Sequence, residues 1–172
     1  HDRLAQAIQR AHRLGKGVAV QFVDLDRFKL INDTLGHNAG DRVLIEAASR
    51  LRQCLRATDT VARLGGDEFI LIQEGVGNPD EVEQVARKVL DAFAPCFPVA
   101  PPQGLFVSVS VGLALYPGDG LTPDELLMRA DLAMYRAKEG GRNRLRFSEA
   151  AIEASAIRTL TLDAVAAANS GH

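Results

Sequence analysis

The sequence predicts an α/β (α+β) fold, with a central mixed sheet flanked by helices. Short apolar runs typical of buried strands alternate along the chain with amphipathic helical segments. Two of the strand-like runs are joined by Gly65-Gly66, which favours an antiparallel hairpin, so we do not expect a wholly parallel sheet. The 172 residues, of which 47% are hydrophobic, suit one domain with a substantial core.

The first third of the sequence predicts three helices and one buried strand. Residues 1–14 have helical spacing of apolar side chains, and residues 18–23 form a mostly apolar run typical of a buried strand. Residues 27–35 predict a short helix, and residues 36–40 a polar loop with two glycines. The amphipathic pattern over 43–55 then predicts a longer helix.

The remaining segments predict the hairpin, two further helices and two further strands. Residues 60–64 and 68–73 flank the glycine pair as the strands of the hairpin. Asn78, followed directly by a proline, predicts the capped start of a helix. On the last long helix, we expect Met128 and Met134 to pack in the core. The other predicted elements are strands over 106–115 and 145–147 and a helix over 122–138.

The domain boundary is expected near the end of the last strand. Residues 1–148 are predicted to form the domain, and the alanine-rich residues 149–172 a helical tail or a linker to a following domain. Because the chain begins at His1 without an initiator methionine, we expect it to be a segment of a longer protein. No apolar run is long enough to span a bilayer and no signal peptide is evident, so we expect a cytoplasmic domain, in a full-length protein that could be tethered to a membrane.

The net charge and the cysteine spacing limit which binding partners, metal sites and disulfides we expect. A net charge of −2 offers no broad basic surface, so we expect no nucleic acid polymer as a partner. A phosphate ligand would have to be held by a few local cations. Cys54 and Cys96 have neither disulfide nor metal-ligand spacing, and we expect both to be small apolar residues of the core.

Acidic residues stand where predicted strands end or turn. Asp24 and Asp26 follow the first strand, and Asp67 and Glu68 follow the glycine pair. If the hairpin pairs beside the first strand, these carboxylates meet at one edge of the sheet, where they repel one another unless a cation lies between them. Oxygen ligands of this kind indicate Mg²⁺ or Mn²⁺, hard ions that also bind phosphate. The alternative is that each residue serves only its own turn.

Four segments of the chain are rich in Gly, Asp or basic residues. In chain order they are residues 24–33, 37–41, 63–69 and 138–143, of which residues 63–69 read Arg-Leu-Gly-Gly-Asp-Glu-Phe. Taken together and in this order, they resemble the motifs of the GGDEF family of diguanylate cyclases. The resemblance implies a palm-like nucleotidyl-cyclase architecture with a largely antiparallel sheet. It also implies that the protein condenses two molecules of GTP into cyclic di-GMP and pyrophosphate.

The resemblance further implies a two-metal mechanism, in which a 3′-hydroxyl attacks an α-phosphate with two Mg²⁺ (or Mn²⁺) ions in each active site. The metal ligands would be Asp24, the backbone carbonyl of Leu25, and Asp67. Asp67 would also help to deprotonate the attacking hydroxyl, with Glu68 beside it as a second catalytic carboxylate. Lys29 would neutralise charge on the triphosphate.

Substrate recognition is also implied by the resemblance. Asn32 and Asp41 would bind the edge of guanine, whose N–H donors adenine lacks, so GTP would be preferred over ATP. His37 has no partner at metal-ligand spacing, and is therefore not expected to bind a metal. The other substrate-binding residues implied are Phe28, Gly65, Gly66, Lys138 and Arg142, together with His37.

An Arg-x-x-Asp segment upstream of the glycine pair resembles the family's inhibitory product site. Arg56 and Asp59 would bind cyclic di-GMP, and Arg87 on the following helix would complete the site. The alternatives are an ordinary surface ion pair between Arg56 and Asp59, three residues apart, and a solvated Arg87.

Because each domain would hold one nucleotide, a cyclic product requires a homodimer, and the full-length protein is expected to contain an adjoining sensor or phosphodiesterase domain. Two other functions stay open. One is a non-catalytic GTP- or cyclic di-GMP-binding regulatory module that controls an attached phosphodiesterase domain. The other is a different nucleotide cyclase or a palm-type polymerase. The presence of Asp24 and Asp67 favours the cyclase over the first, and the pair Asn32 and Asp41 favours it over the second.

Overall fold

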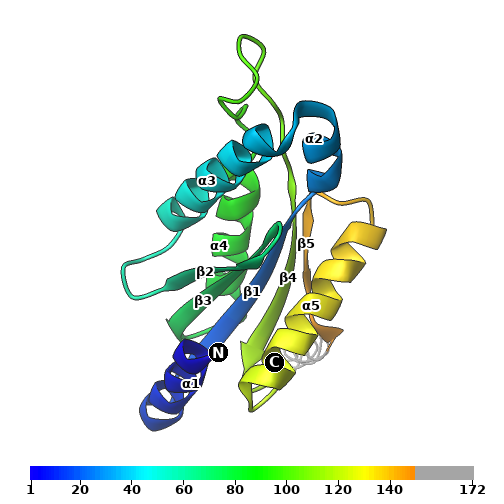
Figure 1. The fold of residues 1–172 in the computed structure, drawn as a ribbon. Helices are drawn as coiled ribbons and strands as arrows, with labels where there is room; N and C mark the ends of the chain where they lie inside the picture. The colour runs from blue at the N-terminus through cyan, green and yellow to red at the C-terminus, as the bar shows by residue number, and fades with distance from the viewer. Residues whose placement is uncertain (150–172) are drawn as a thin grey trace, which may run out of the picture.

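The computed structural model describes residues 1–149 and shows a five-stranded sheet with helices on both faces (Figure 1). The strand order is β2-β3-β1-β4-β5, and only β4 and β5 are parallel to each other. The prediction of a mixed, largely antiparallel sheet is therefore confirmed. The strands are β1 (Gly17–Leu25), β2 (Thr60–Gly65), β3 (Glu68–Val76), β4 (Val109–Tyr116) and β5 (Arg144–Phe147).

Helices cover both faces of this sheet, which explains why β1 is apolar along almost its whole length. Val18, Val20 and Phe22 pack against the core under helices α1 and α5, whereas Ala19 and Val23 belong to the core on the opposite face, under α2, α3 and α4. The helices are α1 (Asp2–Leu14), α2 (Phe28–Leu35), α3 (His37–Gln53), α4 (Pro79–Ala92) and α5 (Pro123–Glu139).

The predicted turns and caps are present. Gly65 and Gly66 both have positive φ (139° and 53°), as the tight hairpin turn requires. The side chain of Asn78 accepts a hydrogen bond from the Glu81 amide at the start of α4. Thr122 caps α5 in the same way.

The predicted loop over 36–40 is wrong. Gly36 alone makes the turn, with φ 89°, and α3 begins at His37 and contains Gly40 within its first turn. The reason is steric: Gly40 lies against Asn32 and Phe28 of α2, so a residue without a Cβ lets the two helices approach closely. Gly40, which contributed to the prediction of a loop, is therefore required for the close contact between α3 and α2.

Three burial predictions are also corrected. Met134 is buried as expected, but Met128 lies on the outer side of α5 with 60% of its surface exposed. Cys96 is exposed and Cys54 only half-buried, although both are free as predicted. Phe106 is 76% exposed, and β4 begins only at Val109. In each case the apolar residue type predicted burial that its position in the fold does not provide.

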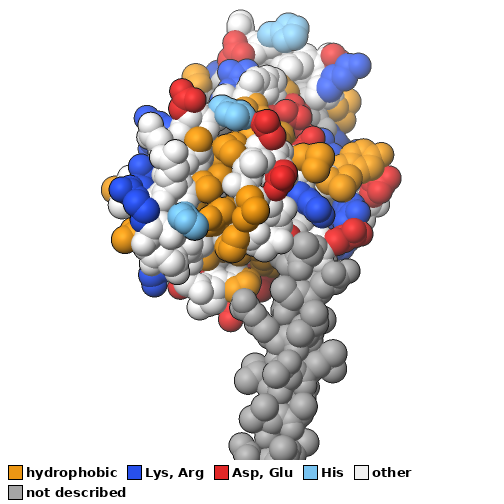
Figure 2. All heavy atoms as spheres, turned by 90° about the horizontal axis from the view of Figure 1, so that it is seen from below, with side chains coloured by type: hydrophobic (Ala, Val, Ile, Leu, Met, Phe, Trp, Pro, Cys, Tyr) orange, Lys and Arg blue, Asp and Glu red, His pale blue; other side chains and the backbone are white. Residues whose placement is uncertain are grey.

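The surface agrees with the balanced composition. Figure 2 shows Lys and Arg side chains interspersed with Asp and Glu on the face seen from below, and not gathered into one basic surface. Within residues 1–149, no helix has both the length and the apolar character needed to cross a membrane. The predicted tail beyond residue 149 lies outside the described residues.

Candidate active site

The acidic residues meet at one end of the sheet because β1 is antiparallel to β3. The last residues of β1 therefore lie beside the first residues of β3, with Asp24 opposite Glu68. The amide of Leu25 donates to the carbonyl of Asp67 at 3.1 Å, which ties the hairpin turn to the end of β1. The expected convergence is therefore confirmed for Asp24, Asp67 and Glu68.

Asp24 is the most deeply buried carboxylate of this group, with 3% of its surface exposed. Its Oδ2 lies 2.6 Å from Nζ of Lys138 on α5. Its Oδ1 is buried and has no hydrogen-bond partner among residues 1–149. Burial raises the pKa of Asp24 to about 7, with a further upward contribution from the adjacent Asp67, although Lys138 acts in the opposite direction.

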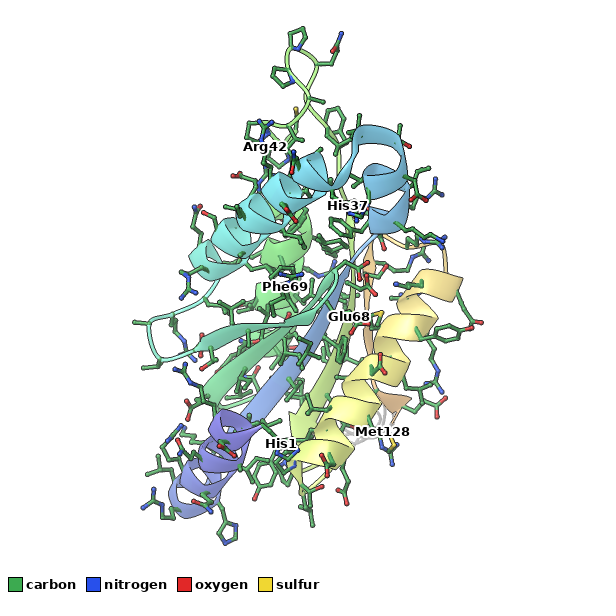
Figure 3. The ribbon with its side chains drawn as sticks, in the orientation of Figure 1. His1, His37, Arg42, Glu68, Phe69 and Met128 are labelled. Carbon is green, nitrogen blue, oxygen red and sulfur yellow. The ribbon has the colours of Figure 1, made fainter. Side chains whose placement is uncertain are left out.

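Glu68 is the second carboxylate whose charge the site disfavours. Burial raises its pKa, and the nearby charges of Asp131 and Asp67 raise it further, while Lys138 lowers it. Glu68 lies between the sheet and α5 (Figure 3). Asp131, an exposed residue of α5, was not predicted from the sequence, because its position on a helix gives no sign that it faces the hairpin.

The donor set fits a divalent cation, although it is not a ready-made cluster of side chains. Among the described residues, no three His, Cys, Asp or Glu side chains gather into a metal-binding group. Asp24 and Asp67 are nevertheless adjacent, and one buried oxygen of Asp24 has no partner. An unpaired buried carboxylate oxygen is costly without a cation, so these two carboxylates are suited to share one.

Asn32 and Gly40 form the second part of the site, between α2 and α3. The Oδ1 atom of Asn32 is buried and has no partner within the described chain. A Cβ added at Gly40 would overlap with this same atom. Gly40 belongs to one of the four family-like segments, but its role could not be predicted from the sequence, because its contact with Asn32 depends on the packing of two helices. Asp41, the next residue of α3, is exposed, as is His37 at the helix start (Figure 3).

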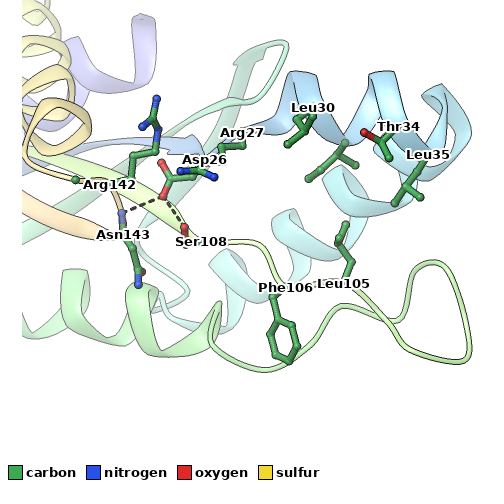
Figure 4. Close-up of a pocket in the computed structure, with 12 residues that line it drawn as sticks. Asp26, Arg27, Leu30, Thr34, Leu35, Leu105, Phe106, Ser108, Arg142 and Asn143 are labelled. Atoms are coloured by element: carbon green, nitrogen blue, oxygen red, sulfur yellow. Dashed lines mark hydrogen bonds between the residues drawn. The ribbon is translucent and has the colours of Figure 1, made fainter.

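Cations surround the acidic end of the sheet. Lys29 and Arg142 are exposed, and neither forms an ion pair with another residue in the part of the chain that the structure describes. Arg142 lines a pocket of about 490 Å³ with Arg27 and the apolar side chains of α2 (Figure 4). Within the described part of the chain, no side chain caps the start of α2, so its first backbone N–H groups are available to an anion.

Asp26 differs from its neighbour Asp24. Both of its oxygens already accept hydrogen bonds, from Ser108, Ser110 and the amide of Asn143. The expectation that Asp26 joins the cation-binding carboxylates is therefore corrected, because its acceptors are occupied within the protein. The two serines and Asn143 could not be found from the sequence, since they belong to segments more than 80 residues away.

The Arg-x-x-Asp segment forms an internal cluster at the end of β3. Asp59, whose side chain is 1% exposed, accepts from the guanidinium of Arg56 and from the amide of Glu74. Arg56 also donates to the carbonyl of Glu74 at 2.8 Å. The ion pair proposed as the ordinary alternative is thus present. Arg87 pairs with Glu83, one turn earlier on α4.

The comparisons with known proteins agree with this geometry. The family model described as "Diguanylate cyclase, GGDEF domain" matches residues 1–144. The chain belongs to the GGDEF family of diguanylate cyclases. The solved GGDEF domain of TpbB (YfiN) from Pseudomonas aeruginosa superposes with a TM-score of 0.84 at 40% identity, and the match covers 86% of this chain and 92% of that one. This confirms the predicted palm-like fold.

Two further relatives show the contexts in which GGDEF domains occur. The bifunctional diguanylate cyclase/cyclic di-GMP phosphodiesterase MucR of P. aeruginosa is 47% identical over 161 residues. The match covers 94% of this chain but only 23% of MucR, so the chain corresponds to about a quarter of that relative. The GGDEF domain of DgcB from Caulobacter crescentus, solved in complex with cyclic di-GMP, has a TM-score of 0.77 at 30% identity, covering 86% of this chain and 87% of that one.

Proposed function

We propose that this GGDEF domain condenses two molecules of GTP into cyclic di-GMP, releasing pyrophosphate at each of two steps. The observation that carries the proposal is the buried Oδ1 of Asp24, which has no hydrogen-bond partner among residues 1–149 and lies beside Asp67 at the end of the sheet. A structural carboxylate would be satisfied within the protein, as Asp26 is. An unsatisfied one is suited to a cation that arrives with the substrate.

Asp24, the backbone carbonyl of Leu25 and Asp67 would hold two Mg²⁺ or Mn²⁺ ions in each active site. When bound, such ions favour the ionised 3′-hydroxyl and stabilise negative charge on the α-phosphate and the departing pyrophosphate. Lys138 forms an ion pair with Asp24 in this structure. Once a cation binds Asp24, the ammonium group of Lys138 would be available to neutralise phosphate charge at the same site.

The protein's own groups would position the substrate and accept the proton. Asp67 would take the proton of the 3′-hydroxyl, and the raised pKa of Glu68 favours a carboxyl that can hold a proton. The uncapped start of α2 offers backbone N–H groups to the phosphates, and Lys29 adds a positive charge there. Gly65 and Gly66 leave the hairpin turn without side chains that would obstruct the nucleotide.

Asn32 and Asp41 would recognise guanine between α2 and α3. The Oδ1 of Asn32, which has no partner in the described part of the chain, and the exposed carboxylate of Asp41 would accept from the N1–H and N2–H groups of guanine. Adenine lacks this pair of donors, and its binding would leave these acceptors unpaired. Phe28 and His37 would contact the nucleotide from the same two helices.

Formation of a cyclic product would require two such domains facing each other, each carrying one GTP. The complex of the DgcB GGDEF domain with cyclic di-GMP supports product binding. In this chain we assign feedback inhibition to Arg56, Asp59 and Arg87. To bind the product, these side chains would have to break their present hydrogen bonds and ion pairs within the protein. We expect the domain to act in the cytoplasm, next to a sensor or phosphodiesterase domain.

The second candidate is a regulatory module that binds GTP or cyclic di-GMP without turnover. The resemblance to MucR, which is named for both activities, favours it as the alternative. To decide, the purified domain is incubated with GTP and Mg²⁺ at high concentration, and the products are separated by chromatography. Cyclic di-GMP that is absent with Asp67→Ala supports the cyclase. GTP that binds but stays intact in the wild-type domain supports the regulatory module.

A further inference from the structure

Asp26 is a buried carboxylate that the proposed mechanism does not use. It follows β1 and is 6% exposed. Its Oδ2 accepts from the hydroxyl of Ser108 and its Oδ1 from the hydroxyl of Ser110, both at 2.6 Å. These serines lie just before and within β4, so the carboxylate joins the ends of two neighbouring strands.

A third hydrogen bond connects Asp26 to a loop far away in the sequence. The backbone amide of Asn143 donates to Oδ2 at 3.0 Å (Figure 4). Asn143 lies between α5 and β5 and directly follows Arg142, one of the phosphate-binding residues in the proposed function. Asp26 therefore binds the backbone of the residue that directly follows Arg142.

This loop has a backbone conformation that needs external support. Arg142 and Asn143 have φ values of 63° and 46°, two successive residues other than glycine in the left-handed region. Such conformations persist where surrounding contacts determine them, and they are common at functional sites. The amide of Arg142 is bonded to the carbonyl of Ala137 at the end of α5, and the amide of Asn143 to Asp26. These two bonds hold the loop from opposite sides.

We propose that Asp26 is a positioning residue that orients Arg142 towards the phosphates of GTP. The inference rests on the proposed function, because it takes the phosphate-binding role of Arg142 from there. Arg142 lines the pocket beside Asp26 and has no ion-pair partner among residues 1–149, so its guanidinium is available to a ligand. Asp26 acts through the backbone of the loop and not through its charge.

Replacement of Asp26 by Asn and by Ala gives opposite expectations for this role. An asparagine keeps one oxygen to accept from the Asn143 amide, and its NH₂ group can donate to a serine hydroxyl that has rotated to accept. Asp26→Asn should therefore retain the loop. Asp26→Ala removes every acceptor and should release it. A metal-binding carboxylate would behave differently, because Asp26→Asn would then weaken metal binding as well.

The test measures binding of GTP and of GMP in EDTA, so that neither turnover nor metal contributes, and separately binding of Mg²⁺ alone. With Asp26→Ala we expect GTP affinity to fall about tenfold, as for the loss of one charge-assisted phosphate contact. GMP binding should change by less than about twofold, because GMP lacks the terminal phosphates. Asp26→Asn should bind GTP and Mg²⁺ as the wild-type protein does.

The Arg142→Ala variant separates failure of this inference from failure of the proposed function. In that background, Asp26→Ala should cause no further loss of GTP affinity. If Arg142→Ala weakens GTP binding but Asp26→Ala does not, only the inference is overturned. If Arg142→Ala itself leaves GTP binding unchanged, the phosphate role of Arg142 fails and the inference fails with it. Should Asp26→Ala not fold, Asp26→Asn decides: retained Mg²⁺ and GTP binding supports the positioning role, and loss of either contradicts it.

Discussion

Asp24 and Gly40 lie at the active-site end of the sheet, where the surroundings limit the charge of the first and the space around the second. Burial disfavours the charge of the Asp24 carboxylate, and a Cβ at Gly40 would overlap with the end of the Asn32 side chain. In the proposed function a cation would restore the ionised form of Asp24. Gly40 keeps the amide oxygen of Asn32 in place between α2 and α3.

The metal-free domain should lose stability as the pH rises from about 4 to about 7. The pKa of Asp24 is raised from 3.8 to about 7, so the folded state binds more protons than the unfolded state across that interval, and the free energy of unfolding must fall as they are released. The raised pKa of Glu68 acts in the same direction. The loss is on the order of a few kcal/mol at most.

Denaturant unfolding in EDTA at pH 5 and pH 8 measures this difference. The Asp24→Asn variant should show a smaller difference between the two pH values, because the titrating group is gone. Equal pH dependence in the wild-type and variant proteins would show that Asp24 does not carry the effect.

Gly40→Ala should weaken GTP binding without unfolding the domain. The new Cβ would overlap with the end of the Asn32 side chain and lie 3.3 Å from the Phe28 ring. The end of the Asn32 side chain can move away, so the cost would fall on the proposed guanine recognition. We expect a rise in KM for GTP of about tenfold and a smaller preference for GTP over ATP, as for one lost base contact. Gly118→Ala is the matched control, because no atom lies within 4 Å of a Cβ added there. An effect of the same size in both variants would contradict the assignment.

Among the elements, those specified by local patterns were predicted well and those specified by packing were not. The hairpin follows from Gly65-Gly66, and the starts of α4 and α5 follow from Asn78 and Thr122 with the prolines behind them. The first residues of α3 were predicted to be a loop, because glycine is typical of loops. Gly40 is helical here, where it packs closely against α2. The role of Asp26 was missed for the same reason, since its partners come from β4 and from the loop after α5.

The segment between α3 and β2 carries the proposed inhibitory site, and Arg56→Ala tests it. Arg56 holds Asp59 and the carbonyl of Glu74, so its removal frees the internal cluster and also removes the group proposed to bind cyclic di-GMP. We expect the inhibition constant for added cyclic di-GMP to rise by about tenfold or more, since a charge-assisted contact is lost. Arg52→Ala, an exposed arginine of α3, is the control. Unchanged inhibition in Arg56→Ala would mean that the cluster only stabilises the end of β3.

In the whole molecule, one end of the sheet gathers the residues that the proposed reaction would use. The carboxylates come from β1 and the hairpin, the proposed guanine acceptors from α2 and α3, and the cations proposed to bind phosphate from α2 and the loop after α5. The sequence was sufficient to predict the sheet and the acidic end, because these depend on local periodicity and turn residues. It could not show which acidic residue is unsatisfied, because that depends on contacts between distant segments.

The need for two domains predicts that specific activity depends on protein concentration. In the proposed mechanism a single domain would hold one GTP and could not form both phosphodiester bonds, so dilution below the dissociation constant of the pair should lower the activity per domain. A dilution series over about 100-fold, analysed by initial rates, measures this. Constant specific activity across the series would contradict the need for an encounter between domains.

The stoichiometry of the products formed from GTP and Mg²⁺ tests the proposed cyclase activity in a single measurement. We expect two pyrophosphates for each cyclic di-GMP, no comparable product from ATP, and loss of both products in Asp24→Ala and Asp67→Ala. GTP that is bound and recovered intact, or pyrophosphate released without cyclic di-GMP, would contradict the cyclase activity.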